Sequence, residues 1–176
     1  MPESNNQNFN HVKIHTQYSI CEGAIKIDNL KDFCKEKKIP CLGLSDTSNL
    51  CGALEFAENI SKVGTQPIIG TQIYLRFEDT TGPLPLIALN ENGYKKIIEL
   101  SSRSYLENDA LSDPHLDIKE LLKDIEGVSL LSGTIQGLFG KLFVKGRLDE
   151  ISKLYKSLAS KFKDNFYLEI QRHGDQ

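Results

Sequence analysis

The sequence predicts an α/β fold in which parallel strands alternate with helices, and two observations support it. Short apolar runs and amphipathic stretches follow one another through nearly the whole chain of 176 residues, an order typical of right-handed βαβ units that share one sheet. Several expected strands also end in polar or small residues, and α/β proteins place functional groups at the carboxyl ends of parallel strands.

The elements expected in the first half follow from hydrophobic periodicity. Residues 9–15 alternate as a strand does, with Phe9, His11, Lys13 and His15 on one face. Residues 26–37 carry an apolar stripe at helical spacing. The other elements expected here are a strand over 39–46, a helix over 50–64 that ends at Gly64, and a strand over 66–77.

The second half continues the alternation after TTGP at 80–83, which predicts a turn. Gly127 is expected to stop a helix, and Asn90 or Asn92 to cap one. The expected elements are a strand over 84–90, helices over 91–106 and 118–127, a strand over 128–133, a helix over 148–162 and a strand over 165–174.

Composition excludes several classes of function. The net charge of −3 argues against strong binding of nucleic acid by this chain alone. The four cysteines form no C-x-x-C pair, so we do not expect a zinc knuckle. We expect reduced thiols in a cytoplasmic protein instead. Residues 1–8 are polar and predict a flexible lead rather than a signal peptide. No apolar run approaches the roughly 20 residues that cross a membrane.

The first strand region, HVKIHTQYSICEG at 11–23, carries residues typical of a metal site. His15 lies at the end of the strand, and Glu22 follows in the next turn. Imidazole and carboxylate groups are ligands for zinc and related ions. Lys13, however, lies on the same face as His15 and would place an ammonium group there. A hydrogen-bonded core histidine is the alternative for His15.

Other polar residues have structural alternatives as well. Asp46 is a candidate general acid or base, or a cap of the next helix together with Ser48. We expect local packing for His11, an exposed loop for His115, and no assignable role for His173.

Six ordered blocks resemble the N-terminal PHP domain (polymerase and histidinol phosphatase) of bacterial DNA polymerase III α subunits. The blocks are FNHVKIHTQYSICEGAIKIDNL, LGLSDTSNLCGALEF, QPIIGTQIYL, NGYKKIIELSS, EGVSLLSG and DNFYLEIQRHG. The resemblance implies part of a distorted TIM-like barrel of seven β/α units with metal ions at the strand ends. It assigns residues 9–176 to this domain, with its last strands beyond the chain end.

The resemblance also implies a ligand set, and several ligands are replaced here. The first histidine of a His-x-His pair is Lys13, and the histidine of an Asp-His pair is Thr47. An acidic position is Gln72, and two further ligand positions are Tyr105 and Thr134. A final Asp-x-His motif would lie beyond Gln176.

His15, Glu22 and Asp46 are therefore the vestigial metal-site candidates. We expect Lys13 to form a salt bridge with Glu22 or Asp46 and to fill the former site. The interpretation is a degenerate site, with no catalytic, cofactor-binding or metal-binding residue in this chain.

The function that the resemblance implies is that of a module in a DNA-directed DNA polymerase, which uses Mg²⁺ in a downstream domain. Its implied partners are the rest of the polymerase chain, a proofreading exonuclease subunit and other replicase subunits, with DNA reached through the parent chain. The alternatives are a metal-dependent phosphoesterase, acting as a proofreading nuclease or a pyrophosphatase, and a stand-alone PHP phosphatase.

Overall fold

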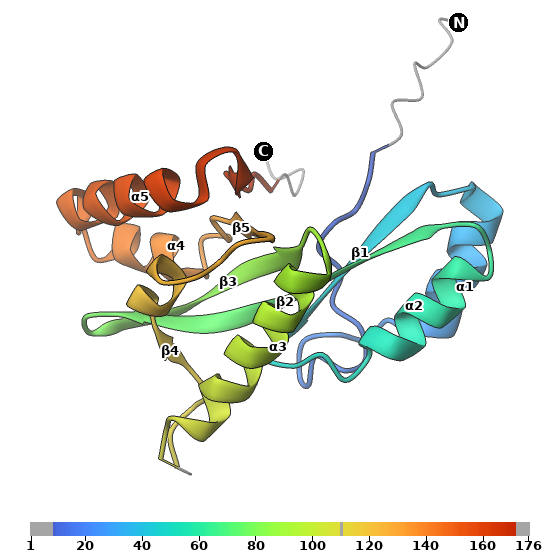
Figure 1. Ribbon diagram of the computed structural model, residues 1–176, viewed down its shortest axis with the longest axis horizontal. Coiled ribbons are helices and arrows are strands. Elements are labelled where there is room, and N and C mark those ends of the chain that lie inside the picture. The colour runs from blue at the N-terminus through green and yellow to red at the C-terminus, as the bar shows by residue number, and fades with distance from the viewer. Residues whose placement is uncertain (1–8, 110, 172–176) are drawn as a thin grey trace, which may run out of the picture.

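A computed structural model describes residues 9–109 and 111–171, and shows a mixed sheet covered by helices on both faces (Figure 1). The expected flexible lead over 1–8 and His173 lie outside the described residues. The sheet has the order β1-β2-β3-β5-β6, and β4 pairs with β2. Its strands are β1 (Cys41–Thr47), β2 (Gln66–Phe77), β3 (Thr80–Ala88), β4 (Leu116–Asp117), β5 (Val128–Leu131) and β6 (Phe166–Tyr167).

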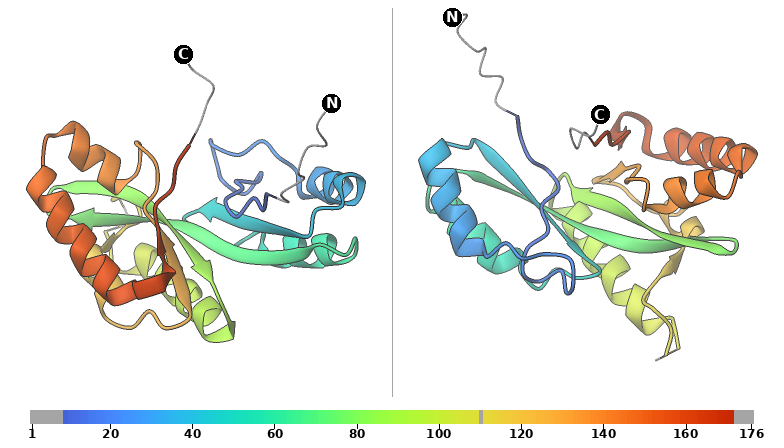
Figure 2. Two further views of the ribbon diagram at one scale, coloured as in Figure 1. Left: turned by 90° about the horizontal axis from the view of Figure 1, so that it is seen from above. Right: turned by 180° about the vertical axis from the view of Figure 1, so that it is seen from behind.

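The strand expected over 9–15 forms only in part. Ile14 makes an isolated parallel bridge to Leu44, and the backbone of Gly43 donates to the carbonyl of His11 at 2.7 Å. The segment therefore lies along the free edge of β1. The view from behind in Figure 2 shows it running past β1 before it loops back toward α1 (Ile27–Lys37).

The parallel alternation fails between β2 and β3, which form an antiparallel hairpin. The connection is Glu78 and Asp79, with Glu78 at a φ of 54°. Two residues can join only antiparallel neighbours, because a parallel crossover needs a dozen or more. TTGP, expected as a turn, instead lies at the start of β3. Because β5 is antiparallel to β3, only β3 runs against the other strands.

The longer helices agree with the periodicity of the sequence. The helix α3 (Glu91–Leu106) begins after Asn90, whose side chain accepts a hydrogen bond from the backbone of Gly93. The helix α5 (Leu148–Phe162) has the expected bounds, and α2 (Ala53–Ser61) is shorter than expected. In place of the helix expected over 118–127, the structure has the shorter 3₁₀ helix η1 (Ile118–Leu122). It also has a helix that the sequence did not predict, α4 (Leu138–Val144).

Two apolar cores hold these layers together. The larger lies around β2 and β3, where Leu84, Leu86 and Leu100 are fully buried, between α3 on one face and α4 with α5 on the other (Figure 1). The smaller joins α1, α2 and β1 around Phe56. Among the described helices, none is long and apolar enough to span a membrane.

The sheet does not close into a barrel within the described residues. The β6 strand pairs with β5 over Phe166 and Tyr167 only, and no strand of the described chain joins β6 to the 11–16 segment. Of the strand expected over 165–174, the part up to residue 171 is described, and only residues 166–167 of it form a strand. The structure supports a mixed α/β fold, whereas the TIM-like closure expected from the sequence is not seen in the described part.

Candidate functional site

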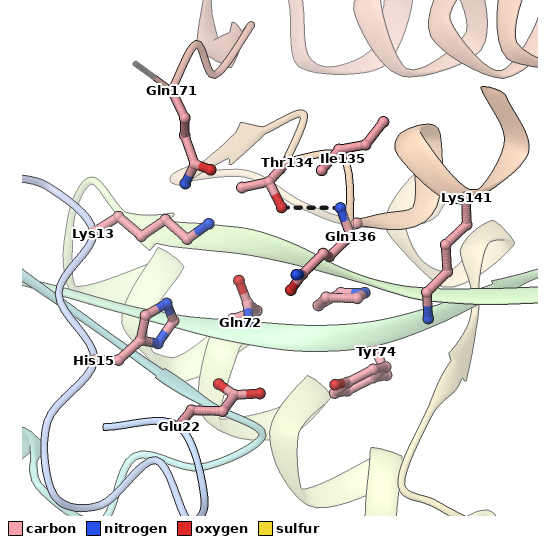
Figure 3. A pocket seen from close by; sticks show the side chains of 12 residues that line it. Lys13, His15, Glu22, Gln72, Tyr74, Thr134, Ile135, Gln136, Lys141 and Gln171 are labelled. Atoms are coloured by element: carbon pink, nitrogen blue, oxygen red, sulfur yellow. Dashed lines mark hydrogen bonds between the residues drawn. The ribbon is translucent and has the colours of Figure 1, made fainter. Parts of the chain in front are cut away.

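A polar cavity of about 750 Å³ lies between the N-terminal segment, β2 and the loop that follows β5 (Figure 3). Lys13, His15 and Glu22 reach it from the N-terminal side. It is lined by Lys13, His15, Glu22, Gln72, Tyr74, Pro83, Thr134, Ile135, Gln136, Gly137, Lys141 and Gln171. Five positions singled out from the sequence thus meet here, namely Lys13, His15, Glu22, Gln72 and Thr134.

The Lys13 ammonium forms an ion pair with Glu169, and not with Glu22 or Asp46 as the sequence led us to expect. Its Nζ lies 3.0 Å and 3.2 Å from the two carboxylate oxygens of Glu169. Both side chains are largely buried, with 15% and 13% of their surface exposed. Glu169 follows β6, and its backbone donates to the hydroxyl of Ser132, which ties this part of the chain to the end of β5.

Glu22 has a different partner, because the Thr47 hydroxyl donates to its carboxylate. The amide of Gln72 in turn donates to the Thr47 hydroxyl at 3.2 Å. These residues therefore form a hydrogen-bonded chain from β2 through β1 to the N-terminal loop. Two of them, Thr47 and Gln72, occupy positions where the PHP resemblance implies metal ligands.

The imidazole of His15 lies at the cavity wall. Its Nδ1 atom is buried and has no hydrogen-bond partner in the described protein. Burial lowers the pKa of His15 below its ordinary value near 6.5, and the neighbouring Lys13 ammonium lowers it further. The carboxylates of Glu22, Asp46 and Glu169 act in the opposite direction but do not outweigh these causes. The structure thus favours the neutral imidazole.

Asp46 does not line the cavity, and its fully buried carboxylate organises the N-terminal loop. It accepts hydrogen bonds from the Thr16 backbone at 2.6 Å, from the Thr16 hydroxyl at 2.7 Å and from the Ser19 hydroxyl at 2.7 Å. It does not cap the next helix together with Ser48, since the N-cap of α2 is Gly52 and has no side-chain hydrogen bond. This arrangement is typical of a structural carboxylate.

The donor set at the cavity does not fit a divalent metal cluster. The part of the chain that the structure describes holds no group of three or more His, Cys, Asp or Glu side chains placed to bind one ion. His15 and Glu22 are two potential ligands, and Lys13 places a positive charge beside them. A protonated amine has no lone pair for coordination, and its charge repels a cation.

The remaining candidates lie away from the cavity or have local roles. Tyr105, assigned to a ligand position from the sequence, is half exposed in the last turn of α3 and does not line the cavity. His11 packs edge-on against Phe9, and His115 Nδ1 lies 2.8 Å from the carbonyl of Asp113. All four cysteines are free thiols.

Sequence reasoning missed Glu169, Lys141 and Tyr74. Lys141 donates to the carbonyl of Thr81 at 2.8 Å, and its Nζ lies 6.0 Å from the ring centroid of Tyr74. The alternation in YLEIQ, at 167–171, would have placed Glu169 on one face with Gln171. That signal was available, but nothing in the sequence paired Glu169 with a residue 156 positions earlier.

A family model and relatives of known sequence show the family of this chain. Residues 11–173 match the family model described as the PHP domain. The chain is 38% identical over 99% of its length to the DNA polymerase III subunit alpha of Caulobacter vibrioides, and 34% identical over 94% to that of Borreliella burgdorferi. It spans only 16% and 15% of those relatives. A solved structure from Bifidobacterium adolescentis, assigned as a metal-dependent phosphoesterase, aligns over 88% of this chain and 56% of its own with 15% identity and a TM-score of 0.45.

Proposed function

This chain belongs to the PHP domain family, and from this premise we propose that it is the N-terminal PHP module of a replicative DNA polymerase III α chain. The parent chain would carry out template-directed DNA synthesis with Mg²⁺ in a domain outside this sequence. The module itself would have a non-catalytic role. It would support the polymerase and provide a docking surface for a proofreading exonuclease subunit.

The observation that carries the non-catalytic proposal is the Lys13–Glu169 ion pair. A phosphoesterase that activates water with a metal needs an open cation site. Here an ammonium group lies among the candidate ligands and is bound by a carboxylate at 3.0 Å. In addition, the Thr47 hydroxyl donates to the Glu22 carboxylate and accepts from the Gln72 amide. These contacts occupy the former ligand positions with protein hydrogen bonds, which supports a scaffold role.

Binding of the exonuclease subunit tests the docking role. The full-length α chain and a form lacking this module would be compared for binding to the purified exonuclease subunit by biolayer interferometry. We expect the truncated chain to lose binding and to extend primers more slowly, and its residual primer extension reports a folded polymerase domain. Undiminished binding by a truncated chain that still extends primers would contradict the proposal.

Metal-dependent phosphoester hydrolysis is the second candidate, favoured by the retention of His15 and Glu22 at the cavity wall. It predicts that the full-length chain holds zinc or manganese after dialysis and hydrolyses p-nitrophenyl phosphate or pyrophosphate, with loss of both after chelation. A His15→Gln variant would lose hydrolysis but not primer extension. We expect neither bound metal nor hydrolysis.

A further inference from the structure

We infer that Lys13 is the resident cation of this cavity, and that its ion pair with Glu169 joins the two edges of the sheet that the described residues form, where a bound metal would otherwise organise the carboxylates. This inference goes beyond the docking role, because it concerns what holds the module together and needs neither the exonuclease nor DNA.

The position of the two residues in the sheet carries the first step. Lys13 lies in the segment that pairs with the free edge of β1, through Ile14 and Leu44. Glu169 lies just past β6, at the opposite end of the strand order. Among the described residues, this ion pair is the only hydrogen bond or salt bridge between residues 9–25 and 163–171.

The surroundings explain why an ammonium group suits this place. Glu22 and Glu169 both act electrostatically on the His15 imidazole, and an ammonium group beside His15 compensates negative charge on this side of the cavity. Glu22 is satisfied by a neutral hydroxyl donor from Thr47. Glu169 is more than four-fifths buried and has Lys13 as its cationic partner. Removal of either member would leave a largely buried charge without its partner.

Hydrogen exchange on the full-length chain, read by mass spectrometry, tests the inference because it reports each segment separately. In Lys13→Met and in Glu169→Gln, we expect peptides covering 11–16 and 166–171 to exchange about tenfold faster. Peptides from α3 should not change, which shows that the module stays folded. The double variant should exchange no faster than either single variant, since both remove one shared contact.

Matched variants separate the ion pair from general effects of charge. The reversed pair Lys13→Glu with Glu169→Lys should restore slow exchange at both segments. Lys95→Met removes the exposed ion pair with Glu91, whose side chains are 68% and 78% exposed, and should change nothing near residues 13 and 169.

Several results would overturn the inference. One is unchanged exchange in the single variants, and another is an additive double variant. A reversed pair that exchanges as fast as the single variants would show that complementary charge is not what joins the edges. Faster exchange of the unmodified chain after treatment with EDTA would show that a bound metal, and not Lys13, supplies the cation.

Discussion

Thr16 and Asp46 are joined by two hydrogen bonds to one carboxylate, from the Thr16 backbone at 2.6 Å and from its hydroxyl at 2.7 Å. Both residues are fully buried. The Ser19 hydroxyl adds a third bond to the same carboxylate and also accepts from the backbone of Thr47 at 3.1 Å. The carboxylate of β1 therefore holds the loop that carries His15 and Glu22 to the cavity.

Asp46→Asn should destabilise the chain by about 2–4 kcal/mol, because an amide nitrogen would face donors where an acceptor is needed. Urea unfolding followed by circular dichroism measures the change. Asp109→Asn provides the control, since Asp109 is exposed, and should stay within about 0.5 kcal/mol. A loss for Asp46→Asn no larger than that would mean that its buried hydrogen bonds carry little net free energy.

Gly93→Ala should also destabilise the fold, although alanine normally favours a helix by about 1 kcal/mol over glycine. A Cβ at position 93 would lie 1.8 Å from the carbonyl oxygen of Gly127, so α3 would have to move from the loop before β5. We expect a cost of about 2–3 kcal/mol by thermal or urea unfolding.

Gly64→Ala is the matched control for Gly93→Ala. A Cβ there meets no atom within 4 Å, and only its φ of 82° opposes the substitution. Its cost should be near 1 kcal/mol. Equal costs at the two positions would show that the contact with Gly127 is easily relaxed.

The lowered pKa of His15 predicts a dependence of stability on pH. The unfolded chain takes up the imidazole proton first, near pH 6.5, so folding stability is lost as the pH falls through that value. His15→Gln should remove this contribution, at most about 1 kcal/mol between pH 7 and pH 5. Urea unfolding at both pH values measures it. A steeper slope in the variant would contradict a neutral His15.

Lys13→His combined with Thr47→His should raise metal affinity, because the double change removes the ammonium group and adds imidazole ligands beside His15 and Glu22. Zinc at a hundredfold excess over its dissociation constant would stabilise the double variant by roughly 2.7 kcal/mol. Thermal unfolding with and without zinc, and metal content after dialysis, are the measurements.

The control for that experiment is Lys95→His, which places an imidazole on the exposed face of α3. It should leave zinc binding as in the unmodified chain. Absence of zinc from the folded double variant would contradict the assignment of residues 13 and 47 to former ligand positions.

The sequence predicted the helices better than the sheet, for a physical reason. The periodicity of 91–106 and 148–162 is local, and both helices have the expected bounds. The direction of β3 depends instead on the short turn at Glu78 and Asp79, and the left-handed backbone of Glu78 has no strong marker in the sequence. The composition of 118–127 is typical of an α-helix, but the structure has a 3₁₀ helix over 118–122. Ile118 and Leu121 of this 3₁₀ helix pack into the larger core.

Some residues singled out from the sequence line the cavity, whereas their contacts were not anticipated. His15 and Glu22 reach the cavity from the N-terminal segment, Gln72 from within β2, and Thr134 from the loop after β5. Which carboxylate binds Lys13 depended on where the chain after β6 passes, and this is a tertiary property. Asp46 similarly lies near the cavity but turns its oxygens to the loop.

The separation of 156 residues between Lys13 and Glu169 has a consequence for synthesis on the ribosome. At 5–20 residues per second, the ion pair must wait roughly 8–30 s after Lys13 is made until Glu169 is added. The β2–β3 hairpin, joined by a two-residue turn, is complete long before that. The N-terminal segment can pair with β1 as soon as residues 41–47 are made, but its contact with the chain after β6 forms only at the end of this sequence. The two attachments of the segment are therefore made at widely separated times during synthesis.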